Sequence, residues 1–473
     1  MATKPVVRSH IVPSNTSNLR KIVRVVPRAR NIEAFLLLFA LGINAYELAQ
    51  IQLSTLQIYN AEILTYWAPI AVLGFAIHLL LRGRASEADP LILPIVVALN
   101  GLGVAEIYRL DLAHIATKGY ELASSTGNLF GLKQVIWTSV AMVAAFLVIR
   151  FVPSHLFFRR YVYIAMFVGL FLLVLPMVPG IGLNINGAQL WIGVGGFTFQ
   201  PGELAKIALT IFFAGYLVQR RESLAIVGRK VLGVQLPRAR ELGPILVIWV
   251  ASLLVLVVER DLGTSLLYFG LFLVMIYVAT GRAIYVAVGL GMFVTGALVA
   301  SQLMSYVSGR VDAWLNPFDP KNYDAVGGSY QLAQGIFGMA HGGIMGSGLG
   351  GGVPQLVPLA ESDFIVATIG EELGLVGLFA VLVMYLLLAY RGLRIGFNHK
   401  DDFSKLLATG LSFVVTLQTF IVIGGVTRVL PLTGLTTPFL AAGGSSLLAN
   451  WIIAALLLRV SDTVGNSSRV VAL

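Results

Sequence analysis

Long, continuously apolar runs alternate with short polar stretches over most of this chain. A helix that crosses a bilayer needs roughly 20 mainly apolar residues, whereas the strands of a membrane barrel have about 10 residues of alternating polarity. The long, unbroken runs favour helices, and about twelve spans are predicted on this basis. They cover residues 33–52, 62–82, 90–108, 134–152, 161–179, 203–219, 242–258, 263–280, 284–304, 363–390, 404–426 and 434–459.

The composition agrees with a chain that lies mostly in lipid. Hydrophobic residues make up 57% of the sequence, charged residues 12%, and the mean hydropathy is +0.85. Soluble domains have about 25% charged residues. Because each span must satisfy its own backbone hydrogen bonds in lipid, we predict an all-α polytopic membrane protein. The chain has no cysteine, which excludes disulfides, thiolate catalysis and cysteine-bound metals.

Basic residues are concentrated in the loops on one side of the predicted bundle. In this composition the net charge of +10 is better explained by cytoplasmic loops beside anionic membrane lipids than by binding to nucleic acid. We therefore predict a plasma-membrane protein with both termini in the cytoplasm and the loop at 305–362 outside. The basic residues assigned to the cytoplasmic side are Arg82, Arg84, Arg159, Arg160, Arg220, Arg221, Arg229, Lys230, Arg238, Arg240, Arg282, Arg391, Arg394, Lys400, Arg459 and Arg469.

The same pattern divides the chain into regions. Residues 1–31 are predicted to be a basic cytoplasmic tail without a cleavable signal, and residues 32–89 hold two N-terminal spans. Residues 90–460 form the main helical domain, which includes the large extracellular loop at 305–362 between the ninth and tenth spans. Residues 461–473 form a short cytoplasmic tail.

The loop at 305–362 is a candidate functional region, because polar loops of this length are usually functional. It ends beside Asp363, and a carboxylate carried into the start of a span is a functional candidate. The alternative is that Ser362 or Asp363 caps the following helix. Gly342–Gly352 lacks the G-K-[ST] of a phosphate-binding loop and is predicted to be flexible. The lone His341 is interpreted as a loop residue.

Several other charged residues are predicted near the outer face. Glu203 and Lys206 are three apart and share one helical face. They could form a structural ion pair, or Lys206 could contact an anionic substrate. Arg310 and Arg428 could bind phosphate groups, although Arg428 could equally snorkel to the membrane interface. Asp261 lies in a tight outer turn.

Glu371 and Glu372 follow Asp363 by eight and nine residues. On a continuous helix they would lie roughly 12 Å deeper and point to different sides. They cannot then both face one cavity, so one of them is predicted to be structural.

Four motifs occur along the chain in the order, and at the positions relative to the predicted spans, that one known family shows. They are Gln200–Lys206 (QPGELAK), Asp261–Thr264 (DLGT), Ser362–Ile365 with Glu371–Gly374 (SDFI and EELG), and Gly434–Phe439 with Gly443–Ser446 (GLTTPF and GGSS). They resemble the motifs of the FtsW/RodA/SpoVE group, the SEDS (shape, elongation, division, sporulation) family. The resemblance spans about residues 90–460. The two spans before residue 90 resemble the extended N-terminus of actinobacterial RodA-type members.

The resemblance implies a bacterial peptidoglycan glycosyltransferase that joins lipid II units into glycan strands at the outer membrane face and releases undecaprenyl diphosphate. It implies a class B penicillin-binding transpeptidase as a partner, together with elongasome or divisome membrane proteins. Asp363 matches the family's catalytic aspartate, and we interpret it as the general base. A divalent cation, Mg²⁺ or Mn²⁺, could bridge the diphosphate and a carboxylate. The expected substrate-binding residues are Glu203, Lys206, Arg310, Asp261, Trp191 and Gln200.

The sequence departs from the family pattern at a few positions. Gly202 replaces the usual serine, and Leu190 stands where many members have arginine before Trp191. Glu259 and Arg260 replace a Q-P pair before Asp261. Ala441–Ala442 replaces serine and tyrosine.

Two other functions compete with the glycosyltransferase. Twelve spans with cytoplasmic termini also suit a lipid II flippase or another membrane transporter. Carriers, however, usually show internal repeats and ionisable groups near the midplane, whereas the motifs here gather at the outer face. The third hypothesis is an inactive scaffold for a penicillin-binding protein.

Overall fold

The protein is a polytopic helical membrane protein. The computed structural model describes residues 28–119, 129–185, 188–194, 197–225, 227–231, 234–237, 260–325 and 328–472. Within these residues, eleven helices are long and apolar enough to cross a membrane, in agreement with the predicted fold class. The predicted span at 242–258 lies outside the described residues.

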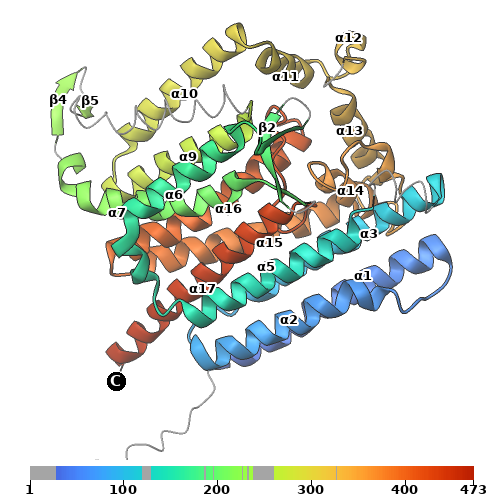
Figure 1. Cartoon of the computed structure of the whole chain (residues 1–473), viewed down its shortest axis with the longest axis horizontal. Coiled ribbons are helices and arrows are strands. Elements are labelled where there is room, and N and C mark those ends of the chain that lie inside the picture. The colour runs from blue at the N-terminus through green and yellow to red at the C-terminus, as the bar shows by residue number, and fades with distance from the viewer. Residues whose placement is uncertain are drawn as a thin grey trace, which may run out of the picture.

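The long helices run side by side in one bundle (Figure 1). The apolar runs predict where they cross lipid, but most helices extend beyond those runs. They are α1 (Arg28–Leu56), α2 (Ile63–Arg84), α3 (Ile92–Lys118), α5 (Gly131–Phe151), α6 (Val162–Val174, flanked by η1 at His155–Tyr161 and η2 at Leu175–Met177), α7 (Pro201–Ala225), α9 (Leu262–Thr280), α10 (Ala283–Leu303), α15 (Gly374–Asn398), α16 (Asp402–Val426) and α17 (Gly444–Ala472).

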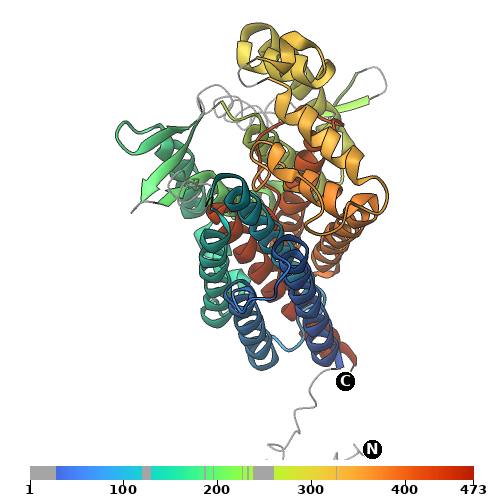
Figure 2. The same ribbon diagram turned by 90° about the vertical axis from the view of Figure 1, so that its right-hand side faces the viewer.

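The segment between α10 and α15 gathers at one end of the bundle, which we call the loop end, and the C-terminus lies at the other end (Figures 1 and 2). This segment was predicted as a loop, but much of it is helical. One consequence is that His341 belongs to a helix, which corrects its interpretation as a loop residue. The short elements here are α11 (Ser305–Leu315), α12 (Pro320–Tyr323), α13 (Tyr330–Gly342), η3 (Pro354–Leu356) and α14 (Ile365–Glu372).

Two small antiparallel sheets were not predicted. One contains β1 (Gly182–Ile185), β2 (Ala188–Val194) and β3 (Phe197–Phe199), and the other pairs β4 (Val227–Val231) with β5 (Val234–Pro237). All five strands lie in connections between helices and are only three to seven residues long. Such short segments give too few alternating positions for the period of a strand to stand out.

The predicted span at 363–390 is wrong at its start. The chain forms the short helix α14, breaks at Leu373 and Gly374, and only then enters α15. Gly374 has a φ of +66°, a left-handed backbone that favours glycine. Asp363 itself lies in a turn before α14, so it is not carried on the spanning helix.

Close approach of backbones places α3 at the centre of the bundle. Of the membrane-crossing helices in the described residues, α3 is the most buried. A methyl group added at Gly101 would lie 1.6 Å from Nδ2 of Asn44 on α1, and one at Gly103 would lie 2.2 Å from the carbonyl oxygen of Leu440. Small residues at such contacts let helices approach closely in lipid, so α3 joins the N-terminal helices to the segment before α17.

We expect Gly103→Ala to destabilise the protein by about 1–3 kcal/mol, because the added methyl group overpacks the contact with Leu440. Gly42→Ala is the matched control, since Gly42 lies within α1 and has no atom within 4 Å of an added methyl group. That control should be neutral or stabilising by up to about 1 kcal/mol, because alanine favours a helix. Thermal unfolding in detergent measures both. Equal melting temperatures for the two variants would contradict the packing described here.

Candidate active site

Asp363 lies at the loop end, in the turn that leads into α14. It is half-buried, while the next residue, Phe364, is fully buried. Phe364 occupies the N-cap position of α14, and no side chain caps that helix. The alternative that Ser362 or Asp363 serves as a helix cap is therefore not what the structure shows. The carboxylate of Asp363 is placed by the turn for another purpose.

Arg310, on α11, faces the same small space as Asp363. A methyl group added at Gly434 would lie 3.8 Å from Oδ2 of Asp363 and 4.0 Å from each terminal nitrogen of Arg310. Arg310 Nη1 also donates a hydrogen bond of 2.8 Å to the carbonyl oxygen of Leu432. Gly434 has a φ of +79°, so glycine suits this backbone, which lies in contact with both charged groups.

The surroundings of Asp363 favour its protonated form. Burial raises the pKa of Asp363 from its ordinary value of 3.8 to about 7, and the Arg310 guanidinium opposes this shift. The nearby carboxylates of Glu361 and Asp261 raise the pKa further. A carboxyl group whose pKa lies near neutrality can both accept and release a proton, which is the property that general acid–base catalysis requires.

Asp261 lies near this group but has a structural role as well. Its side chain caps α9 by accepting hydrogen bonds from the backbone N–H of Thr264, at 2.9 Å, and from the hydroxyl of the same residue. It is 5% exposed, and burial raises its pKa. The structure therefore places Asp261 next to the charges of Arg310 and Asp363, with its own oxygens already bonded.

Glu203 and Lys206 form a buried network between helices. Lys206 Nζ donates to Oε2 of Glu203 at 2.5 Å, to Oε1 of Gln418 at 2.8 Å and to Oδ1 of Asn450 at 3.3 Å. Lys206 is 1% exposed. The network ties α7 to α16 and α17, which is the structural alternative that the sequence left open for this pair.

The segment before α17 connects this network to the site. Gln418 Nε2 donates to the backbone oxygen of Thr436 at 3.0 Å, and Thr436 lies two residues from Gly434. The Glu203–Lys206 network thus supports the backbone that forms the floor of the space shared by Asp363 and Arg310.

Trp191 and Gln200 lie on a different part of the loop end. Trp191 is half-buried on β2, opposite Leu183 of β1. The backbone N–H of Gln200 donates to the hydroxyl of Ser445 at 2.8 Å, which joins the start of α7 to the start of α17. In the described residues, none of the contacts that these two residues make brings them to Asp363.

Both Glu371 and Glu372 hold the glycine-rich loop, although only one of them was predicted to be structural. Oε1 of Glu371 accepts from the N–H of Val353 at 2.8 Å, and Oε2 of Glu372 accepts from the N–H of Gly350 at 2.7 Å. Their other neighbours differ, since Glu371 lies beside His341 and Glu372 beside Arg109. His341, at the end of α13, lies 3.4 Å from Glu371. The loop is therefore held in place, not free as predicted.

Arg428 is exposed, and its guanidinium bonds to the backbone of α11. Its Nε and Nη2 atoms donate to the carbonyl oxygens of Trp314 and Leu315, at 2.9 and 2.7 Å. Trp314 Nε1 donates back to the carbonyl oxygen of Arg428. Arg428 has a φ of +60°, and it fixes the end of α11, the helix that carries Arg310.

Two departures from the family pattern, Ala441–Ala442 and Gly202, are at positions whose described hydrogen bonds are made by backbone atoms. The carbonyl oxygen of Ala441 accepts from Gln134, at 3.0 Å, and the N–H of Ala442 donates to the backbone oxygen of Glu361 at 2.7 Å. Likewise, Tyr268 donates to the carbonyl oxygen of Gly202 at 2.8 Å. These bonds do not depend on the side chains that differ.

Several residues of this site were missed at the sequence level. Glu361 lies in the same turn as Asp363, and Gln418 and Asn450 complete the Lys206 network. Arg109 on α3 pairs with Glu372, its Nε lying 2.8 Å from Oε1. Polar residues inside apolar runs are a usable signal, and it points to Gln418, Asn450 and Arg109.

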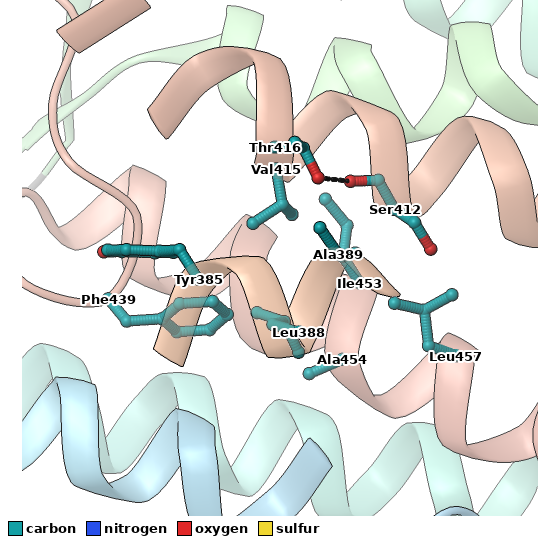
Figure 3. A pocket seen from close by; sticks show the side chains of 10 residues that line it. All are labelled: Tyr385, Leu388, Ala389, Ser412, Val415, Thr416, Phe439, Ile453, Ala454 and Leu457. Atoms are coloured by element: carbon teal, nitrogen blue, oxygen red, sulfur yellow. Dashed lines mark hydrogen bonds between the residues drawn. The ribbon is translucent and has the colours of Figure 1, made fainter. Parts of the chain in front are cut away.

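The other features of the described residues do not compete with this site. A small, mainly apolar cavity lies between α15, α16 and α17, where Phe439 and Tyr385 line one side of it (Figure 3). Its polar groups are the few hydroxyls of Ser412, Thr416 and Tyr385. Among the described residues, no group of three or more His, Asp or Glu side chains is placed to hold a metal ion.

Together, the fold and the site define a polytopic membrane protein with a carboxylate and a guanidinium close to each other at one end of its helix bundle. The chain belongs to the FtsW/RodA/SpoVE family: the family's sequence model, described as cell cycle protein, matches residues 90–465.

Named relatives agree with this assignment. The chain is 44% identical over 437 residues to the peptidoglycan glycosyltransferase RodA of Mycobacterium tuberculosis, covering 92% of this chain and 91% of that protein. It is 42% identical to the RodA of Mycobacterium leprae, with 96% of each chain covered. It is 30% identical to the stage V sporulation protein E of Bacillus subtilis, covering 80% of this chain and 98% of that protein.

Solved structures share the fold. A chain from a peptidoglycan synthase complex, described as coordinating polymerization and crosslinking, matches with a TM-score of 0.61 and 24% identity over 80% of this chain and 98% of the other. The rod shape determining protein RodA of Thermus thermophilus matches with a TM-score of 0.52 and 22% identity over 79% of this chain and 96% of the other.

A substitution at Lys206 can distinguish a structural role for this residue from a role in substrate binding. We expect Lys206→Met to destabilise the protein by about 3–5 kcal/mol, because it leaves Glu203 as an unpaired buried charge. The double variant Glu203→Gln/Lys206→Met should recover much of that loss. Thermal unfolding of the purified variants measures both. A Lys206→Met protein that melts like the wild type but binds substrate poorly would show that Lys206 is a substrate contact.

Proposed function

We propose that this chain is a peptidoglycan glycosyltransferase that polymerises lipid II. The observation that carries the proposal is the half-buried Asp363, whose pKa is raised to about 7 and which shares Gly434 as a neighbour with Arg310. The names of the mycobacterial relatives, which are similar over more than 90% of this chain, support the same activity.

The proposed reaction is a single inverting displacement. The 4-hydroxyl oxygen of one sugar bonds to the anomeric carbon of the donor sugar. The bond from that carbon to the lipid diphosphate breaks, and undecaprenyl diphosphate leaves with the electron pair. Asp363 takes the proton of the attacking hydroxyl, a transfer that is typically worth about 10²–10⁴-fold in rate.

Arg310 supports this step in two ways. Its charge opposes the rise in the pKa of Asp363, so that a working fraction of the carboxylate is ionised near neutral pH. Guanidinium groups also bind phosphate oxygens well, and Arg310 is placed beside the carboxylate to stabilise the diphosphate as it leaves. One hydrogen bond to Leu432 fixes the guanidinium.

The loop end is proposed to face outward, with both termini in the cytoplasm. Arg82 and Arg84 lie in the last turn of α2, away from the loop end, and Arg459 of α17 donates to the carbonyl oxygens of Arg84 and Pro153. Basic residues at that end suit the cytoplasmic leaflet. This orientation puts Asp363 where lipid-linked sugars would be joined outside the cell.

Partners and cofactors follow the same proposal. The fold likeness to a chain of a peptidoglycan synthase complex supports a class B penicillin-binding transpeptidase as partner. A divalent cation, Mg²⁺ or Mn²⁺, stays a prediction. Because the described residues offer no cluster of ligands, most of the ligands to such an ion would come from the diphosphate.

We expect Asp363→Asn to lower the polymerisation rate by about 10²–10⁴-fold, because the amide cannot take the proton. Asp324→Asn is the matched control: it makes the same chemical change at an exposed carboxylate of the same segment and should stay active. The measurement is glycan chain formation from lipid II by purified protein in detergent or liposomes, with and without a class B partner.

The same assay separates the competing functions. Lipid II that moves between leaflets without forming polymer would identify a flippase. Partner binding without polymer, even when the partner is added, would identify a scaffold. Full activity of Asp363→Asn would remove Asp363 from the mechanism.

The pH dependence provides an independent prediction. A base with a pKa of about 7 is protonated below that pH, so the rate should fall about tenfold for each pH unit below it and level off above it. Arg310→Gln removes the charge that lowers the pKa, so the acid limb should move to higher pH. Lys321→Gln, which removes an exposed charge from α12 in the same segment, serves as the control and should leave the limb in place. A limb that stays fixed in Arg310→Gln contradicts the pairing.

A further inference from the structure

The first two helices lie outside the part of the chain that matches the family, which begins at residue 90. The alignment with stage V sporulation protein E covers 384 residues, which is 98% of that protein but only 80% of this chain. A relative can therefore be nearly complete and still lack a counterpart to about a fifth of this chain. The helices α1 and α2 are therefore an addition to the common core. We asked what this addition contacts.

Helix α1 is tied to α3 along its length. Nδ2 of Asn44 donates to the carbonyl oxygen of Val97 at 3.2 Å, and Nε2 of Gln52 donates to the hydroxyl of Tyr108 at 3.0 Å. Both helices run to the loop end of the bundle (Figure 1). The last turns of α1 thus stand beside the segment that follows α13.

The contact at that end is with the glycine-rich loop itself. A methyl group added at Gly350 would lie 2.0 Å from the hydroxyl oxygen of Ser54 and 3.1 Å from Cγ2 of Thr55. The backbone of Gly350 therefore rests directly against α1. A side chain at residue 350 would require the hydroxyl of Ser54, and to a smaller extent α1 itself, to move.

The same loop is bonded to α14. The N–H of Gly350 donates to Glu372 at 2.7 Å, and Arg109 joins Glu372 on one side and the carbonyl oxygen of Gly352 on the other, at 2.8 and 2.7 Å. The backbone oxygen of Glu372 also accepts from the N–H of Gly348 at 3.0 Å. A shift of the loop must therefore shift the end of α14.

Buried charge couples the same three elements. Glu106, one turn before Arg109 on α3, is fully buried, and neither of its carboxylate oxygens has a hydrogen-bond partner among the described residues. The ionisable groups that act on it include Glu47 on α1, Glu372 on α14 and Arg109 on its own helix. The three elements therefore meet around one buried carboxyl group.

Helix α14 carries the effect to the site. Every residue of α14 is buried, and the helix spans roughly 12 Å. Phe364, which follows Asp363 directly, packs where a methyl group at Gly335 would come within 2.7 Å of its ring. A short, fully packed helix moves as one body, so its position at Glu372 sets the position of Asp363.

From these contacts we propose that the α1–α2 hairpin is a positioning element for Asp363, acting through Ser54, the loop at 346–353 and α14. None of these groups needs to touch the substrate. The inference rests on the proposed function, because Asp363 is the group that is positioned. It assigns to the added hairpin a role in the rate of polymerisation.

Two glycines of the same loop give a matched test. Gly350 and Gly348 both have a left-handed backbone, with φ of +79° and +92°, so alanine strains both. Only at Gly350 does the added methyl group meet α1, because Gly348 has no atom within 4 Å of it. We expect Gly350→Ala to lower kcat about tenfold or more relative to Gly348→Ala, since a displacement of about 1 Å can cost up to about 10²-fold.

A second change on α1 should reverse the effect. Ser54→Ala removes the hydroxyl that the methyl group meets at 2.0 Å, and the wild-type protein loses little by it, since that hydroxyl bonds only within its own helix. The double variant Ser54→Ala/Gly350→Ala should regain kcat to within about threefold of Gly348→Ala. The KM for lipid II should change little throughout, because the groups altered do not bind it.

A purely structural role predicts a different pattern. Positioning also predicts that the acid limb of the pH–rate profile moves in Gly350→Ala and returns in the double variant, whereas a general loss of folded protein lowers the rate without moving the limb. Equal kcat values for Gly350→Ala and Gly348→Ala, or no recovery with Ser54→Ala, would overturn the proposal.

A third variant covers the case in which Gly350→Ala fails to fold. Ser54→Leu enlarges the same contact from the side of α1 without straining the loop backbone, and it too should lower kcat. Wild-type activity in a folded Ser54→Leu protein overturns the role of the hairpin. A wild-type protein that makes no glycan, with or without a class B partner, overturns the glycosyltransferase assignment instead, so the two failures are distinguishable.

Discussion

The protonation of Asp363 depends on burial, which favours its neutral form, and on the few nearby charges that oppose or add to this effect. Placing a carboxylate among helices disfavours its ionised form, and Arg310 is the nearby cation that opposes this effect. Glu361 and Asp261 act in the other direction. The balance leaves a group that changes its protonation state near neutral pH, and the surrounding elements serve to keep its distances fixed.

Much of the remaining polar structure fixes backbone. Arg428 holds the end of α11, Gln418 holds the segment around Thr436, and Glu371 and Glu372 hold the loop after α13. A polar group buried without a partner is costly in lipid, so each of these side chains satisfies backbone groups that are not in regular helices. Irregular segments can therefore meet at the site without exposing unpaired N–H and carbonyl groups.

Sequence patterns predicted the parts of this structure that depend on local sequence, without contacts between distant segments. The apolar runs located the spanning helices, and the carboxylate of Asp363 stood out because it borders such a run. The break at Gly374 could not be predicted, because Leu373 and Gly374 lie in an apolar run that reads as one helix. The pairing of Arg310 with Asp363 was also hidden, since it depends on how α11 folds back over Gly434. Glu203 and Lys206 were found by spacing, but their burial, and hence their role, is a tertiary property.

The joint between α14 and α15 has a consequence for how the protein responds to its membrane. A spanning helix tilts when the thickness of the hydrocarbon layer changes, and α15 is such a helix. Because the left-handed turn at Gly374 interrupts the helix there, the N–H groups of Leu375 and Val376 bond to the carbonyl oxygens of Gly343 and Ile344, at 3.0 and 3.1 Å, and not to α14. A change in the tilt of α15 with acyl-chain length would therefore act first on the glycine-rich loop, and reach α14 only through it.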